Sequence, residues 1–181
     1  MLFRSVTFNA NSALAGGGIY VSRSRPVLIN VTLSGNTAAS GSGGGLYNSG
    51  SMANPGRPKL VNVIIANSVG GGDCVNDGNS SPDAASNHNL IEDSANACGL
   101  TDGIDGNLVG ADPLLGTLDD NGGLTSTLAL LDGSPAIDAG TSADCPATDQ
   151  RGVMRPFGVT CDIGAYEYVD RIFADGFEAS P

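Results

Sequence analysis

The sequence predicts an all-β protein, a right-handed parallel β-helix (a β-solenoid) that ends in a short, irregular β C-terminal cap. Three observations support this fold class. An apolar motif recurs over about the first seventy residues, a glycine triplet follows each copy, and the polar residues are mainly Asn, Ser, Thr, Asp and Gly. These polar residues favour turns and strands over the interior of helices. The 27 glycines among 181 residues fit frequent bends between short strands.

The recurring motif has apolar residues at its first, fourth and sixth positions. Its copies begin at Phe3, Leu28 and Leu60, and the third ends in Ser68 where the others have Asn. Apolar and polar residues alternate within each copy, so one set of side chains should point inward from a strand. Stacked rungs, about 4.8 Å apart, would place equivalent side chains in ladders. The predicted ladders are Val6 with Val31 and Val63, Phe8 with Leu33 and Ile65, and Asn11 with Asn36. For the two asparagines, unpaired turn residues are the alternative.

The glycine triplets at 16–18, 43–45 and 70–72 recur every 27 residues. They suit corners that require a left-handed backbone or a close approach of two chain segments. The apolar spacing also matches a leucine-rich repeat. However, the Gly- and Ser-rich stretch 37–48 disfavours the helix or leucine-lined return of that fold. The bends therefore favour the β-solenoid, and 89–91 is expected to add one more short rung.

Four cysteines fall into two local pairs, Cys74 with Cys98 and Cys145 with Cys161. Neither pair has CxxC spacing, and His88 alone cannot complete a typical zinc site. We therefore predict two disulfides, each closing a loop of roughly 15–25 residues and contributing about 3 kcal/mol. Disulfides imply an oxidising compartment, so the predicted location is secreted or at the outer cell surface. The start without a signal peptide indicates a fragment or a mis-started gene, and no apolar run is long enough for a transmembrane helix.

The acidic excess lies in the C-terminal half of the chain. Residues 1–99 contain five acidic and five basic side chains, whereas residues 100–181 contain fourteen acidic and three basic ones. This balance argues against nucleic acid as a partner, since phosphate binding requires a basic surface. No cofactor is expected apart from calcium, for which the candidates are Asp102 and Asp105 in one loop and Asp119 and Asp120 in another. Neither loop has the spacing of an EF-hand or of a calcium-binding nonapeptide, so solvated turns are the alternative.

Three regions are predicted along the chain: parallel β-helix rungs at 1–100, a C-terminal cap module at 101–168 and a tail at 169–181. The end of a solenoid exposes apolar core and unpaired strand edges, so a cap is needed there. The first rung, if Met1 begins the chain, presents such an edge and is expected to promote dimers or aggregates. Arg151 is expected to form a buried ion pair that orients the cap loops. Its candidate partners are Asp138, Asp149 and Asp162.

Two parts of the sequence resemble known families. FNAN at 8–11, followed by GGI at 17–19, resembles the repeats of polymorphic outer-membrane proteins and of related pectate-lyase-like β-helices. From residue 107 onward the chain resembles the C-terminal region of the choice-of-anchor Q family of bacterial β-helix proteins. The matching segments are NLVGADPLLG (107–116), NGGLTSTLALL (121–131), GSPAIDAG (133–140), TDQRG (148–152), RP (155–156) and CDIGAYE (161–167). The resemblance implies display outside the cell and carries no particular activity.

The last segment, RIFADGFE at 171–178, resembles a tail found at the ends of secreted proteins from some gammaproteobacteria. This resemblance implies a sorting signal that an export system recognises. An edge strand or a disordered tail is the alternative.

The predicted function is an adhesin-like or glycan-contacting structural role without catalysis in this chain. Enzymes built on parallel β-helices need clustered carboxylates, or Asp-bound calcium with a basic residue, and residues 1–75 contain Asp73 as their only acid. We therefore assign no catalytic or cofactor-binding residue. Tyr20 and Tyr47 fall one rung apart and form either a sugar-binding strip or an ordinary stacked ladder. The expected partner is a polysaccharide or a component of a host or cell surface.

Two alternatives for the function remain open at this point. The chain could be the C-terminal part of a polysaccharide lyase or glycoside hydrolase whose catalytic rungs lie upstream. It could also be an export and display cap without a ligand. Product release from a polysaccharide distinguishes the enzyme from the adhesin, and the display cap shows neither binding nor cleavage.

Overall fold

The computed structural model describes residues 1–170, and this part of the chain consists of short strands and loops with almost no helix. The strands are β1 (Leu2–Asn9), β2 (Ile19–Ser22), β3 (Val27–Ser34), β4 (Leu46–Ser49), β5 (Lys59–Val61), β6 (Ile64–Ala66), β7 (Cys74–Asn76), β8 (Leu90–Ile91), β9 (Leu108–Val109), β10 (Leu115–Asp119) and β11 (Thr127–Leu130), and the 3-10 helix η1 is Ile104–Gly106. Within residues 1–170 the chain has no helix with the length and hydrophobicity of a membrane span.

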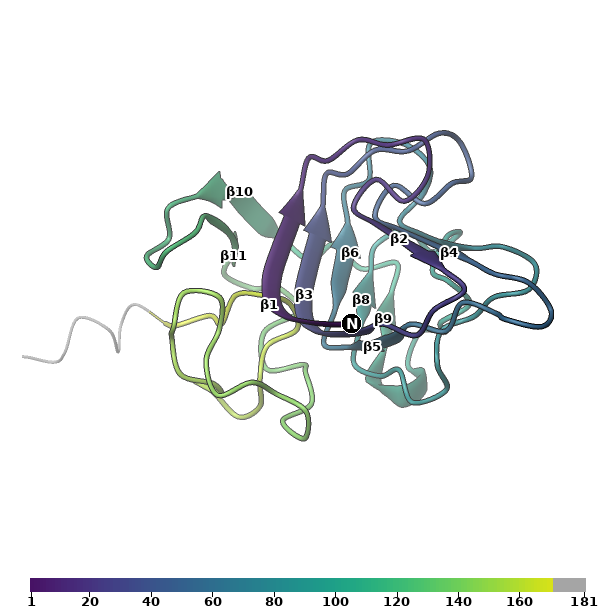
Figure 1. Cartoon of the computed structure of the whole chain (residues 1–181). Helices are drawn as coiled ribbons and strands as arrows, with labels where there is room; N and C mark the ends of the chain where they lie inside the picture. The colour runs from purple at the N-terminus through teal and green to yellow at the C-terminus, as the bar shows by residue number, and fades with distance from the viewer. Residues whose placement is uncertain (171–181) are drawn as a thin grey trace, which may run out of the picture.

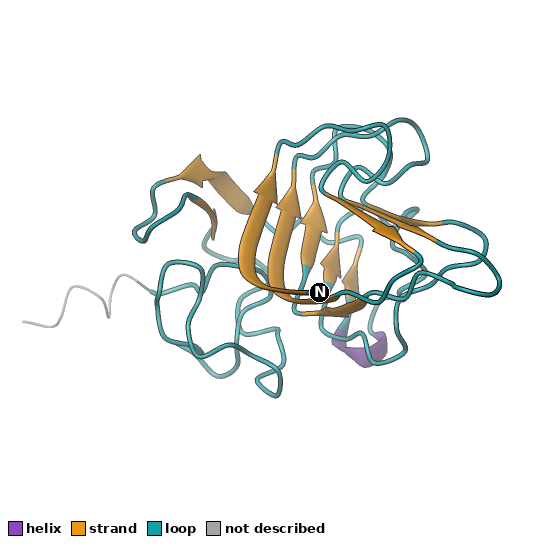
Figure 2. Ribbon diagram, in the orientation of Figure 1, coloured by secondary structure: helices purple, strands orange, loops and turns teal. Residues whose placement is uncertain are grey.

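Two parallel sheets face each other across the core of the protein. The main sheet has the order β1–β3–β6–β8–β9, with β5 also paired to β3, and the second sheet has the order β2–β4–β7 (Figure 1). The first three passes of the chain add strands to both sheets in parallel register, and the next two passes add β8 and β9 to the main sheet alone, whereas β10 and β11 form an antiparallel hairpin (Figure 2). This all-β arrangement with stacked parallel strands fits the β-solenoid class.

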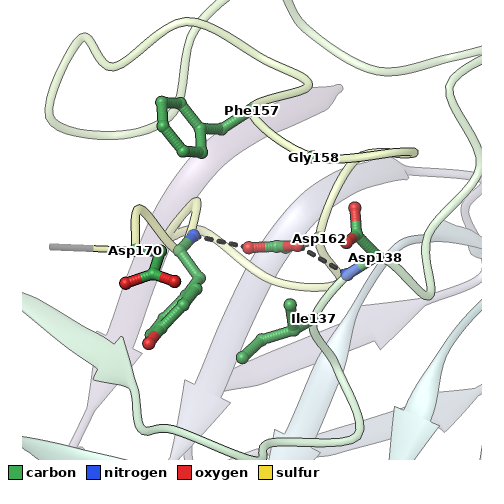
Figure 3. Close-up of a pocket in the computed structure, with 7 residues that line it drawn as sticks. Ile137, Asp138, Phe157, Gly158, Asp162 and Asp170 are labelled. Carbon is green, nitrogen blue, oxygen red and sulfur yellow. Dashed lines mark hydrogen bonds between the residues drawn. The ribbon is translucent and has the colours of Figure 1, made fainter. Parts of the chain in front are cut away.

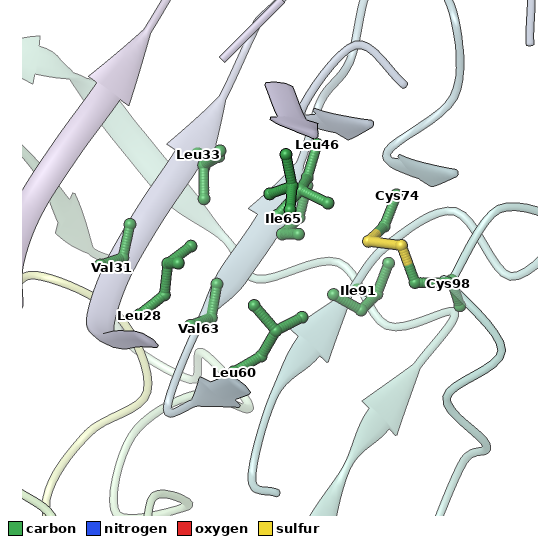
Figure 4. Packing of buried hydrophobic residues seen from close by; sticks show 12 residues of the cluster. Leu28, Val31, Leu33, Leu46, Leu60, Val63, Ile65, Cys74, Ile91 and Cys98 are labelled. Carbon is green, nitrogen blue, oxygen red and sulfur yellow. A yellow bond between two sulfur atoms is a disulfide. The ribbon is translucent and has the colours of Figure 1, made fainter. Parts of the chain in front are cut away.

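The apolar ladders lie between the two sheets. The register of β1 against β3 pairs Val6 with Val31 and Phe8 with Leu33, and β6 extends the second ladder by pairing Ile65 with Leu33. This is the stacking that the repeat predicts. Each fully buried side chain of this kind contributes about 1.5–3 kcal/mol relative to an exposed one. The fully buried members of this core are Leu28, Val31, Leu33, Leu46, Leu60, Val63, Ile65, Cys74 and Ile91 (Figure 4).

At one equivalent position in each rung of the main sheet, a residue with a left-handed backbone bends the chain. These residues are Ser5, Asn30, Asn62 and His88, with φ between 46° and 53°. Gly106 holds the same position in the last rung, with φ of 70°, and the His88 ring lies against it. The left-handed region is costly for most side chains, and Asn and Gly are the residues that enter it most readily. The bend changes the direction of the chain within the rung. As a result, the inward side chains before and after the bend point into the same core.

Buried asparagines pair from rung to rung. The Oδ1 atom of Asn36, which is fully buried, accepts the backbone N–H of Asn11 at 2.9 Å and its side-chain N–H at 3.0 Å. The Nδ2 atom of Asn36 donates to the Phe8 carbonyl in the rung above. A second ladder, which was not predicted, joins Asn89 to Asn107 through the same two kinds of hydrogen bond, both 3.0 Å. The ladder and β9 carry the main sheet beyond residue 100, the predicted end of the rungs.

The C-terminal module lies along the side of the main sheet and not across the end of the solenoid, where a cap was predicted. Its loops and its strand β11 sit on the face of the main sheet that points away from β2 and β4 (Figure 1). Hydrogen bonds reach across several rungs: Asn30 donates to the Asp162 carbonyl at 2.8 Å, and Asn62 accepts the N–H of Thr141 at 2.8 Å. The module therefore fastens neighbouring rungs together from outside.

The module docks laterally because the outer face of β6 and β8 is apolar. Ile64, Ala66 and Leu90 point away from the solenoid core, are fully buried, and pack against apolar residues of the module. A strand with apolar residues on both faces must be covered on both faces. The contacting side chains of the module include Leu130, Ala136 and Ile163.

Candidate functional site

A cleft of about 490 Å³ lies in the C-terminal module, beside the loops that carry Asp138, Phe157 and Asp162 (Figure 3). Asp162 is buried, and its two carboxylate oxygens accept the backbone N–H groups of Asp138 and Tyr168. Burial, and after it the nearby charge of Glu167, raises the pKa of Asp162 from 3.8 to about 7.

The acidic side chains of the cleft hold the surrounding loops together. One oxygen of Asp138, Oδ1, accepts the N–H groups of Val159 and Thr160, at 2.6 and 3.1 Å, while both oxygens of Asp162 are already engaged. Catalysis by paired carboxylates requires two groups that face the reacting bond. These two acids instead fasten three loop segments to one another, so we assign neither of them a catalytic role.

The ion pair predicted at Arg151 has Asp149 as its partner. The Nη2 atom of Arg151 lies 2.8 Å from Oδ2 of Asp149, and both side chains are buried. The guanidinium group also lies over the ring of Tyr166, 3.5 Å from its centroid. Asp138 and Asp162 were the other candidates, and neither forms an ion pair with Arg151. The carboxylate oxygens of these two residues instead accept backbone N–H groups of other loop segments.

A second ion pair, Arg155 with Glu167, was missed by the sequence analysis. Its N–O distance is 3.0 Å, and the two side chains are 0% and 1% exposed. The oxygens of Glu167 also accept the N–H groups of Phe157 and Asp162, at 2.8 and 3.1 Å. Burial raises the pKa of Glu167 and lowers that of Arg155. The sequence does contain a signal for this ion pair, because Glu167 is an acid within the otherwise apolar stretch 163–168. Acidic side chains are seldom buried among apolar residues unless they are paired.

The calcium candidates make contacts within their own turns. Asp102 accepts the N–H of Val109 at 2.9 Å, and Asp119 and Asp120 accept backbone N–H groups close by in the chain. Asp105 lies in η1 with a left-handed φ of 51°. Within residues 1–170, no three His, Cys, Asp or Glu side chains lie close enough together to hold a metal ion. The structure thus does not bring the candidates together as one ligand set.

Both predicted disulfides are present. Cys74 and Cys98 are joined near the end of the solenoid core, and Cys145 and Cys161 are joined inside the C-terminal module. The first links β7 to the loop of the following rung, and the second ties two loops of the module to each other. Two disulfides indicate an oxidising, extracellular environment for the folded chain.

The two tyrosines form a stacked pair on the outer face of the second sheet. Tyr20 on β2 and Tyr47 on β4 are paired in register, with ring centroids 5.7 Å apart and an interplanar angle of 11°. Tyr20 is 53% exposed and borders a groove of about 430 Å³, whose lining also includes Phe3, Ser24 and Arg25. The Tyr20 ring therefore both stacks on Tyr47 and lines the groove.

The N-terminal rungs are basic. The first 72 residues contain five basic side chains and no acidic one. Among the described residues, Lys59 alone of these five takes part in an ion pair, with Asp144 at 3.0 Å. The others leave their charge uncompensated at the surface of the rungs, and they are Arg4, Arg23, Arg25 and Arg57.

Comparison with models of protein families, with curated proteins and with solved structures finds no match to this chain.

Proposed function

We propose that the chain belongs to a secreted or surface-displayed right-handed parallel β-helix that contacts glycans without cleaving them. The observation that carries this proposal is the stacked pair of Tyr20 and Tyr47 on the exposed face of the second sheet. The two disulfides support a location outside the reducing cytoplasm.

The tyrosine pair has the features of a sugar-contacting surface. Tyr47 holds one face of the Tyr20 ring, so little side-chain entropy is lost when a ligand packs on the other face. Aromatic rings offer a large apolar area with a polar hydroxyl at one end, which suits the C–H faces and hydroxyl groups of a sugar ring. Ser24 and Arg25, in the same groove, supply hydrogen-bond donors around it.

The acids of the module support a non-catalytic role. Asp138, Asp149, Asp162 and Glu167 each accept backbone N–H groups or pair with a buried arginine. A carboxylate that is committed to such contacts can leave them only by unfastening the loops of the module.

The test is a panel of plant, algal and bacterial polysaccharides, scored separately for retention of the protein and for release of reducing ends or unsaturated uronates. We expect retention without cleavage for at least one member. Tyr20→Ala should weaken that retention about tenfold, which corresponds to about 1.4 kcal/mol. Tyr20→Phe keeps the stacked ring and should retain most of the binding.

The matched control is Leu14→Ala, which removes another exposed apolar side chain outside the tyrosine pair. Equal retention of Tyr20→Ala and the parent chain would contradict the tyrosine site. Cleavage of any polysaccharide would contradict the non-catalytic role and favour the lyase or hydrolase alternative. No retention of any member would favour a display module without a ligand.

A further inference from the structure

Two arginines lie in register on neighbouring rungs, at the corner between the second sheet and the main sheet. Lys59 pairs with Val27 of β3. Two residues earlier, the N–H of Arg57 donates to the Ser24 carbonyl at 2.9 Å. Arg57 therefore holds the position of Arg25 one rung further along the stack. Both arginine side chains are exposed, and neither forms an ion pair within residues 1–170. We refer to them as the arginine pair.

The acids of the following rung are engaged elsewhere. The Oδ2 atom of Asp77 accepts the N–H of Gly50 at 2.7 Å and the hydroxyl of Ser49 at 3.0 Å. Asp83 accepts a backbone N–H two residues further along its own turn. Like charges that lie directly opposite each other on neighbouring strands repel. An anion from outside that contacts both arginines would remove this repulsion, and the described part of the chain supplies no counterion of its own.

The arginine pair and the tyrosine pair occupy the same two rungs. Tyr20 and Arg25 belong to one rung and border the same groove, and Tyr47 and Arg57 belong to the next. An extended polysaccharide advances per sugar by nearly the same distance as the solenoid does per rung, about 4.8 Å. A glycan that runs along the stack can therefore place successive sugar rings at the tyrosines and successive acid groups at the arginines.

We propose that the ligand of this face is an anionic glycan, whose carboxylate or sulfate groups pair with Arg25 and Arg57 while its sugar rings contact Tyr20 and Tyr47. The inference rests on the proposed glycan-contacting function and names the class of glycan. A guanidinium group presents its N–H donors in a planar fork that matches either kind of acid group. A neutral glycan would have the tyrosines alone to contact.

The test compares two pairs of polymers that share a backbone and differ in charge. Alginate is compared with its propylene glycol ester, and dextran sulfate with dextran, so the two pairs separate a carboxylate source from a sulfate source. The affinity of the full chain is measured by affinity electrophoresis. We expect the charged member of at least one pair to bind about tenfold more tightly at low salt. The difference should shrink at about 0.5 M salt, where exposed charges are screened.

Substitutions in the arginine pair should weaken binding of the charged polymer and leave binding of the neutral one unchanged. Arg25→Gln and Arg57→Gln should each reduce the affinity about threefold, and the double variant about tenfold. Arg57→Lys keeps the charge and should lose less than Arg57→Gln. The matched control is Arg4→Gln, which removes the same charge from an exposed position on β1 and should bind as the parent does.

Four outcomes would overturn the inference. If the charged and neutral polymers bind equally and Tyr20→Ala weakens both, the glycan-contacting function stands and the anionic class is wrong. If Arg4→Gln weakens binding as much as the double variant, the overall charge of the rungs is responsible and not the arginine pair. Equally tight binding of polyglutamate would assign the arginines to acidic polypeptides. Binding of neither charged polymer would also contradict the anionic class, and the wider polysaccharide panel then decides the proposed function separately.

Discussion

The solenoid and the C-terminal module are held together by different kinds of contact. In the rungs, the same backbone ladder and the same inward apolar positions recur, and most side chains of the apolar core are Leu, Ile and Val. In the module, strands are few, and buried charges take the place of a repeated core: Asp149, Arg155, Asp162 and Glu167 are each less than one tenth exposed. One region therefore relies on repetition, and the other on a small set of contacts that occur once.

This difference determines how each region should fail. A rung that loses one side chain keeps its ladder hydrogen bonds and the contacts of the rungs on either side. A buried charge that loses its partner leaves an uncompensated ion in an apolar environment, which is costly. The module should therefore be the more sensitive region to changes in charge, although it covers and buries the outer face of the main sheet.

The largest effect is expected from Arg155→Met. It leaves the carboxylate of Glu167 without its buried partner and should lower the free energy of unfolding by about 3–5 kcal/mol. Because the contact belongs to the module, amide exchange should rise first in 136–168, while β3 keeps its protection. Chemical denaturation together with hydrogen exchange measures both effects.

Two variants serve as controls for Arg155→Met. Lys59→Met removes the partly exposed pair with Asp144 and should cost less than about 1 kcal/mol. The double variant with Glu167→Leu removes both charges and should recover part of the lost stability. If Arg155→Met behaves like Lys59→Met, the view that the module depends on its buried charges is wrong.

Removal of the disulfides should have the next largest effect. The bonds close loops with sequence separations of 24 and 16 residues, and each should contribute about 3 kcal/mol in the chain-entropy view. Paired Cys→Ala substitutions are expected to act locally. Loss of Cys145–Cys161 should loosen the module, and loss of Cys74–Cys98 should loosen the last rungs. Melting curves with and without reductant, followed by exchange mapping of each variant, test this.

The parent chain in reductant is the reference for both double variants. A melting temperature that does not change on reduction would contradict a stabilising role for either bond. If both double variants loosen the same residues, the two regions unfold as one unit and the contrast between them does not extend to their stability.

The parts of the fold that repeat could be predicted, whereas most contacts that occur once and join segments distant in sequence could not. Phe8, Leu33 and Ile65 share one chemistry at regular spacings, so their stacking follows from the pattern alone. The partner of Arg155 is set by how the loops of the module fold back, and no periodicity points to Glu167 among the many acids. The local Cys pairs were predictable because each pair is close in sequence.

The sequence contains a signal for the lateral docking of the module that the alternation of apolar and polar residues does not reveal. Residues 63–66 read Val-Ile-Ile-Ala without a polar interruption, which is typical of a strand that is buried on both faces. The corresponding residues of β3 are Val31, Thr32, Leu33 and Ser34, and their polar members conceal this. Thr32 is buried nonetheless, because its hydroxyl accepts the N–H of Ala165 at 2.9 Å.

The last expected effect is a dependence of stability on pH that originates in the module. The native state raises the pKa of Asp162 to about 7 from the ordinary 3.8, so it binds that proton more tightly than the unfolded chain does. Stability should therefore increase as the pH falls from about 7 toward 4, and the raised pKa of Glu167 acts in the same direction. The raised pKa of Asp73 in the solenoid also adds to this trend. Asp77, whose pKa is lowered to about 2 chiefly by the N–H of Gly50, acts oppositely below pH 4.

We thus expect the melting temperature to be highest near pH 4–5 and a few degrees lower at pH 8. Asp162→Asn cannot ionise and should flatten the profile between pH 5 and 8, while the decrease below pH 4 remains. Asp132→Asn, which removes an exposed acid of the module, is the matched control and should keep the profile of the parent. A parent chain whose stability rises steadily from pH 4 to 8 would show that the Asp162 carboxylate is stabilised as an anion. The cost of its burial would then be outweighed by Arg155 and the two backbone N–H groups that it accepts.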